Sequence, residues 1–195
     1  SDVYKRQLYL LLAGPNYCPE IDEMNENSPI TEFSVQIVGD SLFGADADGC
    51  ASVSTFMSLI LWLQVEDNSV PGATVIGDES IPEQYVSGDW NWTVIDGGGN
   101  DIMPHCTEND CDEVLDEIIT DSGEGLIPDL VEKAQNDGSN VILIGYYSVP
   151  KGSEYEPVIL EVEIVNDRYN EFAKANEGVY FISLKHVMSP EETPD

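Results

Sequence analysis

Short apolar runs alternate along this chain with segments in which apolar residues recur at helical spacing. Neighbouring parallel strands need a crossover of a dozen or more residues, usually a helix, so this alternation strongly constrains the fold. The runs expected to be strands are residues 33–38, 65–68, 90–95, 141–145 and 179–184. The sequence therefore predicts an α/β fold: a three-layer α/β/α sandwich, flavodoxin-like, with a five-stranded, mostly parallel sheet.

The segments between these runs carry the helical pattern. Expected helices lie at residues 51–64, at 81–85, at 111–120, from Leu126 until Asp137, and from Pro157 until Glu177. Residues 141–145 read Val-Ile-Leu-Ile-Gly, an apolar run typical of a strand buried on both faces. With 195 residues and 42% apolar content, the chain can form one α/β domain with a substantial core.

Polar turns follow two of the predicted strands. The first run ends on Gly-Asp-Ser-Leu at residues 39–42, and the run 92–95 ends on Asp-Gly-Gly-Gly-Asn-Asp at residues 96–101. Right-handed crossovers place the carboxyl ends of all parallel strands on one rim of the sheet, so Ser41 and Asn100 are expected there together. A serine hydroxyl beside an amide donor is typical of an esterase site. Tyr146 and Tyr147 follow another strand and are expected either to line the cleft or to cover the strand end.

These turns resemble the SGNH, or GDSL, hydrolase family. Residues 39–42 match its first block, and residues 98–101, Gly-Gly-Asn-Asp, match its third block. Gly72 is the best match for the single glycine of its second block. The resemblance implies a serine esterase or acyl hydrolase without a cofactor. Ser41 would attack the acyl carbon, while the backbone N–H groups of Ser41 and Gly72 and the Asn100 side chain would form the oxyanion hole.

The fourth block of this family, Asp-x-x-His, is not found. The chain holds two histidines, His105 and His186, and the residues three positions before them are Ile102 and Ser183. His186 follows the last predicted strand, on the expected rim, but it lacks the aspartate. We therefore expect residues 32–195 to be a C-terminally incomplete SGNH-like domain whose catalytic pair lies beyond Asp195, and this fragment to be weak or inactive.

Several of these residues also have structural interpretations. Asp40 is expected to brace the turn after its strand, and Asp101 to anchor its own loop through backbone hydrogen bonds. Trp90 and Trp92 are expected on one face of a strand, where sheet-to-helix packing or sugar stacking would use them. The alternative to an esterase is accordingly a non-catalytic carbohydrate-binding or scaffold module on the same fold.

The charge is strongly negative. Seven basic and 38 acidic side chains give a net charge of −31. Such a surface repels phosphate backbones, so no nucleic-acid partner is expected, and the predicted substrate is a small-molecule, glycan or lipid ester. The charge fits a salty or extracellular setting and equally a merely soluble surface. No apolar run is long enough to predict a transmembrane segment.

The N-terminal region reads as processing sequence. Residues 1–7 resemble a translated sequencing adaptor, and residues 8–31 resemble the remnant of a signal peptide followed by a linker. A secreted or periplasmic location is therefore expected. Cys18 is a candidate lipid-anchor cysteine, although the residues before it depart from the usual lipobox.

Two cysteines stand close together in a predicted loop. Cys106 and Cys111 flank Thr-Glu-Asn-Asp, a spacing compatible with a small disulfide, with free thiols, or with a zinc site that also uses His105. A disulfide would stiffen the segment that follows Asn100. Cys18 and Cys50 have no assigned partner.

Overall fold

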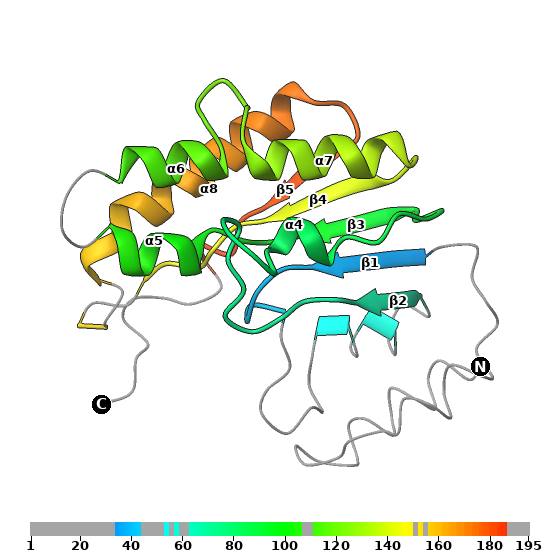
Figure 1. Ribbon diagram of the computed structural model, residues 1–195, viewed down its shortest axis with the longest axis horizontal. Coiled ribbons are helices and arrows are strands. Elements are labelled where there is room, and N and C mark those ends of the chain that lie inside the picture. Colours follow the sequence, from blue (N-terminus) through cyan, green and yellow to red (C-terminus); the bar gives the residue numbers. More distant parts are fainter. Residues whose placement is uncertain are drawn as a thin grey trace, which may run out of the picture.

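A single parallel sheet organises the protein. The computed structural model describes residues 34–43, 53–54, 57–58, 63–106, 111–149, 152–153 and 156–186. The strands are β1 (Ser34–Val38), β2 (Gln64–Asp67), β3 (Trp92–Ile95), β4 (Asn140–Ile144) and β5 (Val179–Ile182). They lie in the order β2-β1-β3-β4-β5, and every neighbouring pair is parallel (Figure 1). This is the flavodoxin-like order, so the predicted fold class is confirmed.

Helices connect the strands where the sequence pattern predicted them. They are α4 (Ile81–Gln84), α5 (Gly99–His105), α6 (Asp112–Ile118), α7 (Leu126–Asn136) and α8 (Ile159–Ala175), the last preceded by a 3-10 turn, η1 (Glu156–Val158). Gly138, with φ of 91°, ends α7 as expected for a helix C-terminus. No helix of the described residues is long and apolar enough to cross a membrane.

The two faces of the sheet pack against different parts of the chain. Val38, Ile95 and Leu143 lie in one register row and belong to the main core, which helices α4 to α8 complete. Ile37 and Val94 face the other way, in a second cluster that Met57 joins. The β1-to-β2 crossover moves along the sheet in the opposite direction from the other crossovers, so the same right-handed rule puts it on the opposite face (Figure 1).

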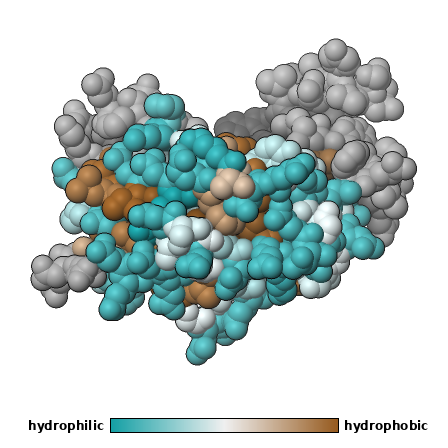
Figure 2. Space-filling model, turned by 90° about the horizontal axis from the view of Figure 1, so that it is seen from above, coloured by the Kyte–Doolittle hydropathy of each residue, from teal (hydrophilic) through white to brown (hydrophobic). Residues whose placement is uncertain are grey.

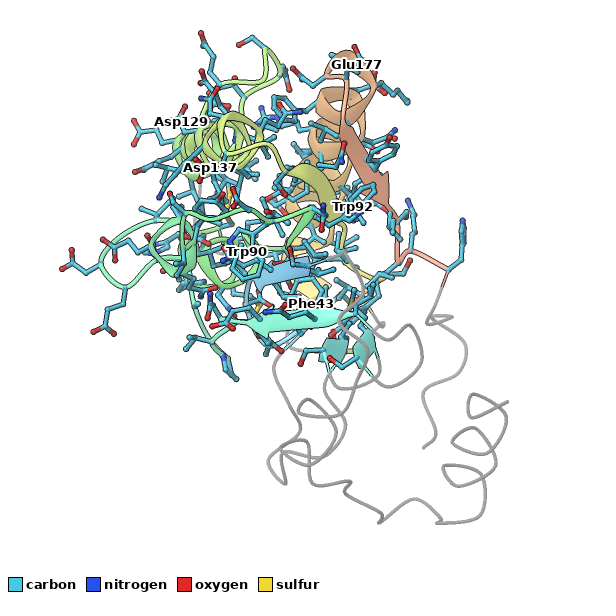
Figure 3. All side chains as sticks on the ribbon, turned by 90° about the vertical axis from the view of Figure 1, so that its right-hand side faces the viewer. Phe43, Trp90, Trp92, Asp129, Asp137 and Glu177 are labelled. Atoms are coloured by element: carbon cyan, nitrogen blue, oxygen red, sulfur yellow. A yellow bond between two sulfur atoms is a disulfide. The ribbon has the colours of Figure 1, made fainter. Side chains whose placement is uncertain are left out.

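The surface of the helical layer is mainly hydrophilic. Figure 2 shows teal residues covering most of the described surface on the side of α6, α7 and α8, with apolar patches between them. Asp129, Asp137 and Glu177 lie on the outer side of the molecule in Figure 3, away from Phe43 beside the sheet. Asp129 and Glu177 are thus exposed to solvent, while the apolar faces of these helices are buried.

Two predicted elements differ from the structure. The helix expected at residues 51–64 is helical at the described positions 53–54 and 57–58, but Gln64 already begins β2, so its predicted end is wrong. Helix α5 occupies a segment expected to be a loop, because the glycines at 97–99, the last of which begins the helix, and Pro104 inside it weaken the helical signal. The predictions for residues 1–31, among them the signal-peptide remnant and the lipid-anchor candidate Cys18, fall on residues that the structure does not describe.

The tryptophan prediction is also wrong. Trp90 lies before β3 and packs against the main core, whereas Trp92 begins the strand and packs on the opposite face. The Trp92 ring lies 5.5 Å from that of Tyr180, tilted by 50°. Figure 3 views the sheet from the amino ends of the strands, where both tryptophans lie, so they are at the end opposite the motif turns.

Candidate active site

Ser41 and Asn100 line one pocket at the carboxyl ends of β1 and β3. Its volume is about 360 Å³. The lining residues come from the two motif turns, from the segment after β4 and from α5, the 152–153 turn and α8: Asp40, Ser41, Leu42, Gly99, Asn100, Met103, Tyr146, Tyr147, Val149, Ser153 and Val162. The structure therefore brings together the two side chains that the motifs singled out, and both predicted cleft tyrosines line the same space.

The Ser41 turn is held through the residues before the serine. The side chain of Gln84 binds both backbone groups of Gly39, since its Oε1 accepts from the Gly39 N–H at 2.7 Å and its Nε2 donates to the Gly39 carbonyl at 3.0 Å. A Cβ atom at Gly39 would overlap the carboxylate of Asp96. Position 39 therefore needs glycine for this close approach. Ser41 itself is exposed.

Asp40 is the connecting residue of the site. Its side chain is buried with 3% exposure. One carboxylate oxygen accepts from the backbone N–H of Leu42 at 2.8 Å, which confirms that Asp40 braces the turn. The other accepts from the Tyr146 hydroxyl at 2.9 Å and from the Asn100 amide at 3.3 Å. Asp40 thus joins three segments that are distant in sequence.

Asn100 lies in the first turn of α5, which begins after Gly98 in the left-handed region at φ of 104°. Its carboxamide donates to the Ala73 carbonyl at 2.9 Å as well as to Asp40. Asp101 accepts from the N–H groups of Val75 and Ile76 at 2.8 and 2.9 Å. Asp101 therefore anchors its own turn to the 74–76 segment through backbone hydrogen bonds, as the sequence predicted.

Gly72 is not among the residues that line the Ser41 pocket. It is exposed, adopts φ of 83°, and lines a separate depression that extends to Gln84. The next residue, Ala73, supplies the carbonyl that binds Asn100. The structure thus ties the Gly72 loop to the site through its neighbour, and a donor role for Gly72 stays a prediction.

Neither histidine lines the pocket. His105 is exposed at the C-terminal end of α5, not in a loop, and His186 is exposed beyond β5. Among the described residues, the pocket lining also lacks lysine and arginine. Its one charged side chain is that of Asp40, so the pocket is suited to an uncharged group.

A second buried carboxyl group supports the Ser41 turn from below. Asp96 follows β3, is fully buried, and accepts from the Asp40 backbone N–H at 2.8 Å through Oδ1. Its Oδ2 has no hydrogen-bond partner among the described residues. Burial, followed by the negative charge of Asp40, raises the pKa of Asp96 well above its usual range. Burial also raises the pKa of Asp101.

Sequence reasoning missed Gln84 and the role of Asp96. Gln84 lies in a one-turn helix with no motif, so nothing in the sequence connects it with Gly39. Asp96 directly follows β3, at the same edge of the sheet as Ser41 and Asn100, and this position in the sequence could have indicated a role in the site. Tyr146 carried the same signal, but its hydrogen bonds required the structure.

The disulfide interpretation of the cysteine pair is confirmed. Cys106 and Cys111 are bonded, with their Cα atoms 4.9 Å apart. Both thiols are used, so the zinc and free-thiol alternatives are wrong for this pair. The bond joins the end of α5 to the start of α6, behind the helix that carries Asn100.

No family model matches the sequence, and no curated protein matches it. Solved structures do. A catalytic mutant of Axe2, an acetylxylan esterase from Geobacillus stearothermophilus, aligns with a TM-score of 0.59 at 15% identity, covering 82% of this chain and 81% of that one. A G-D-S-L family protein from Desulfitobacterium hafniense DCB-2, described as lipolytic, aligns with a TM-score of 0.57 at 15% identity, covering 77% and 76%.

The chain has the SGNH hydrolase fold. A family two carbohydrate esterase from Clostridium thermocellum, solved in complex with cellohexaose, also shares it, with a TM-score of 0.51 at 13% identity over 79% of this chain and 54% of that one. The resemblance inferred from the motif turns is therefore confirmed for the SGNH fold. At these identities the likeness concerns the fold, and the chemistry must be argued from the site.

Proposed function

We propose that this protein hydrolyses carboxylic esters through Ser41. The observation that carries the proposal is the pocket that Ser41 and Asn100 share at the carboxyl rim of an SGNH-fold sheet. The structural neighbours named above include an acetylxylan esterase and a carbohydrate esterase, which supports ester hydrolysis as the kind of reaction. Another structure of the acetylxylan esterase is a catalytic mutant with a serine-to-alanine replacement.

The proposed reaction begins with attack of the Ser41 Oγ on the acyl carbon. The serine proton passes to a general base, and the carbonyl electrons form an oxyanion. The Ser41 and Gly72 N–H groups and the Asn100 amide are the proposed donors to that oxygen. Collapse of the tetrahedral species breaks the bond to the leaving oxygen, which takes the proton back from the base and departs as the alcohol. The acyl-serine that remains is hydrolysed by water through the same steps.

Asn100 has one hydrogen bond that it can exchange in this reaction. Its bond to Ala73 is 2.9 Å long, whereas its bond to Asp40 is 3.3 Å long. The longer bond is the weaker one, so we expect the N–H directed at Asp40 to turn toward the oxyanion. The bond to Ala73 keeps the carboxamide in position, so only the N–H that faces Asp40 has to change its partner when the charge develops.

The SGNH pattern implies that an Asp-x-x-His pair supplies the general base. Neither His105 nor His186 lines the pocket. Free imidazole can supply the missing group, because it accepts a proton near neutral pH as a histidine side chain does. Ser41-dependent hydrolysis by the 195-residue chain is therefore expected to rise with imidazole concentration.

The proposed substrate carries an uncharged acyl group. Met103, Val149 and Val162 line the pocket, and no cationic side chain of the described residues does. An anionic ester would also be repelled by the net charge of −31. The proposal includes a secreted or periplasmic location, where glycan and lipid esters are available.

The deciding experiment compares the wild-type chain with Ser41→Ala. Both are incubated with p-nitrophenyl acetate over a range of imidazole concentrations, and a fluorophosphonate probe is added in parallel. Wild type is expected to show imidazole-dependent hydrolysis and labelling, and Ser41→Ala neither above the background of imidazole alone. Ser87→Ala, which changes an exposed serine that does not line the pocket, is the control.

Two outcomes would reject an esterase role. Equal rates and equal labelling of wild type and Ser41→Ala would remove Ser41 from the mechanism. No reaction of either protein under any imidazole concentration, together with binding of unmodified glycans, would instead favour a non-catalytic carbohydrate-binding module.

A further inference from the structure

Tyr146 enters the pocket from a backbone that is held on both sides. The Tyr146 N–H donates to Asn166 Oδ1 at 2.8 Å, and Asn166 Nδ2 donates to the Tyr146 carbonyl at 3.2 Å. The preceding Gly145 lies so close to Asn166 and Phe181 that an added Cβ would approach both at 2.6 Å. Helix α8 therefore fixes the place from which the phenol ring extends.

The hydroxyl of Tyr146 joins the two motif turns. It donates to the Asp40 carboxylate at 2.9 Å and accepts from the Gly99 N–H at 2.8 Å. Asp40 directly precedes Ser41, and Gly99 directly precedes Asn100. The phenol is close enough that a Cβ at Gly99 would come within 2.9 Å of its ring carbons. One hydroxyl thus spans the distance between the proposed nucleophile and the proposed oxyanion donor.

We infer that Tyr146 is a positioning residue, which sets the separation of Ser41 and Asn100 by holding Asp40 and Gly99. This inference rests on the proposed function of Ser41. Tyr146 and Asn100 bind the same oxygen of Asp40, so the phenol also limits the directions from which the amide can approach that oxygen. Loss of the hydroxyl would free Asp40 and Gly99 together.

The protonation state of the phenol suits this role. Burial, followed by the charges of Asp40 and Asp96, raises the pKa of Tyr146 well above its usual range. The hydroxyl therefore keeps its proton and donates it to Asp40 throughout the neutral range. It has no need to exchange a proton with the substrate, which separates a positioning residue from a general acid or base.

The test uses Tyr146→Phe, which removes the hydroxyl and keeps the ring. The control is Tyr85→Phe, because Tyr85 is a buried tyrosine outside the pocket whose hydroxyl also donates to a carboxylate, that of Asp137, at the same 2.9 Å. In imidazole-supplemented assays, Tyr146→Phe is expected to lower Ser41-dependent kcat by about 10- to 100-fold, with KM changed by less than about twofold. Tyr85→Phe is expected to keep kcat within about twofold of wild type.

Amide hydrogen exchange gives a readout that does not depend on activity. The Gly99 N–H is expected to exchange faster in Tyr146→Phe and unchanged in Tyr85→Phe. Unchanged Gly99 exchange, or equal kcat values for Tyr146→Phe and wild type, would overturn the inference. Ser41→Ala separates failure of the esterase proposal from failure of this inference. That variant loses hydrolysis only if Ser41 is the nucleophile, and it is expected to leave Gly99 exchange unaltered.

Discussion

The turn that carries Ser41 and the turn that carries Asn100 are built in opposite ways. Ser41 is exposed and is held indirectly, because the bonds of its turn go to Gly39 and Asp40. Asn100 lies in the first turn of α5, directly follows the half-buried Gly99, and has both amide N–H directions occupied. The oxyanion donor is thus set by its own contacts, whereas the nucleophile is set by its neighbours.

This difference matches the two chemical tasks. A donor that stabilises developing charge works best when it needs no reorganisation, so direct fixation is useful. A nucleophile must reach the acyl carbon and later release it, so its hydroxyl has to stay accessible. The comparison predicts that changes at Asn100 mainly affect the rate, and that changes beneath Ser41 mainly affect stability.

The largest effect is expected for Asn100→Ala. Removing one oxyanion donor typically lowers kcat by 10²–10³-fold, or about 2.7–4 kcal/mol in barrier height. Ser41-dependent hydrolysis in imidazole measures this loss, and urea unfolding measures stability, which we expect to fall by about 1 kcal/mol. A loss of stability with unchanged kcat would reverse the comparison.

Gln84→Ala is the corresponding change beneath Ser41. It leaves the buried N–H of Gly39 without its acceptor, whereas the Gly39 carbonyl keeps its bond from the Val70 N–H, so the free energy of unfolding is expected to fall by about 1–3 kcal/mol. Gln135→Ala removes an exposed bond to the Glu177 carbonyl and is the control, with a change below about 0.5 kcal/mol. Equal destabilisation of the two variants would contradict the proposed support of the Ser41 turn.

Removal of the Cys106–Cys111 disulfide probes the far end of the Asn100 helix. The chain-entropy relation for a loop this short predicts a loss of about 2 kcal/mol in the double serine variant. Asn100 contacts Asp40 and Ala73 from the first turn of α5, whereas the disulfide lies at the last turn. We therefore expect kcat to stay within about twofold of wild type. A much larger fall in kcat would show that the donor depends on the whole helix.

Asp96→Asn is expected to have the smallest effect, and one that depends on pH. The raised pKa of Asp96 means that the folded state favours the neutral acid. Below its unfolded pKa the group costs nothing, and stability falls as pH rises from there toward the native pKa. The asparagine variant should therefore gain stability relative to wild type as the pH rises above about 4, the ordinary pKa of an aspartate. Asp78→Asn, at an exposed carboxyl group, corrects for the general loss of negative charge.

The sequence by itself determined the elements and the rim on which the motif turns lie. Alternating apolar runs and helical stripes place β1, β3 and β4 correctly, because burial of apolar residues at these periods is local information. The right-handed rule then puts residues 41 and 100 at the same rim without further data. The sequence pattern did not predict α5, which is short and contains glycine and proline, because its stability comes from packing and not from its own helix propensity.

The tertiary structure alone decided how these turns are held. Gln84 lies 45 residues from Gly39, Asp96 lies 56 residues from Asp40, and Tyr146 lies 106 residues from Asp40. The tertiary structure likewise placed Gly72 outside the lining of the Ser41 pocket, in a separate depression that Gln84 also lines. Hydrogen bonds depend on distances of a few tenths of an ångström, and such distances between remote segments arise only once the sheet and its helices have packed.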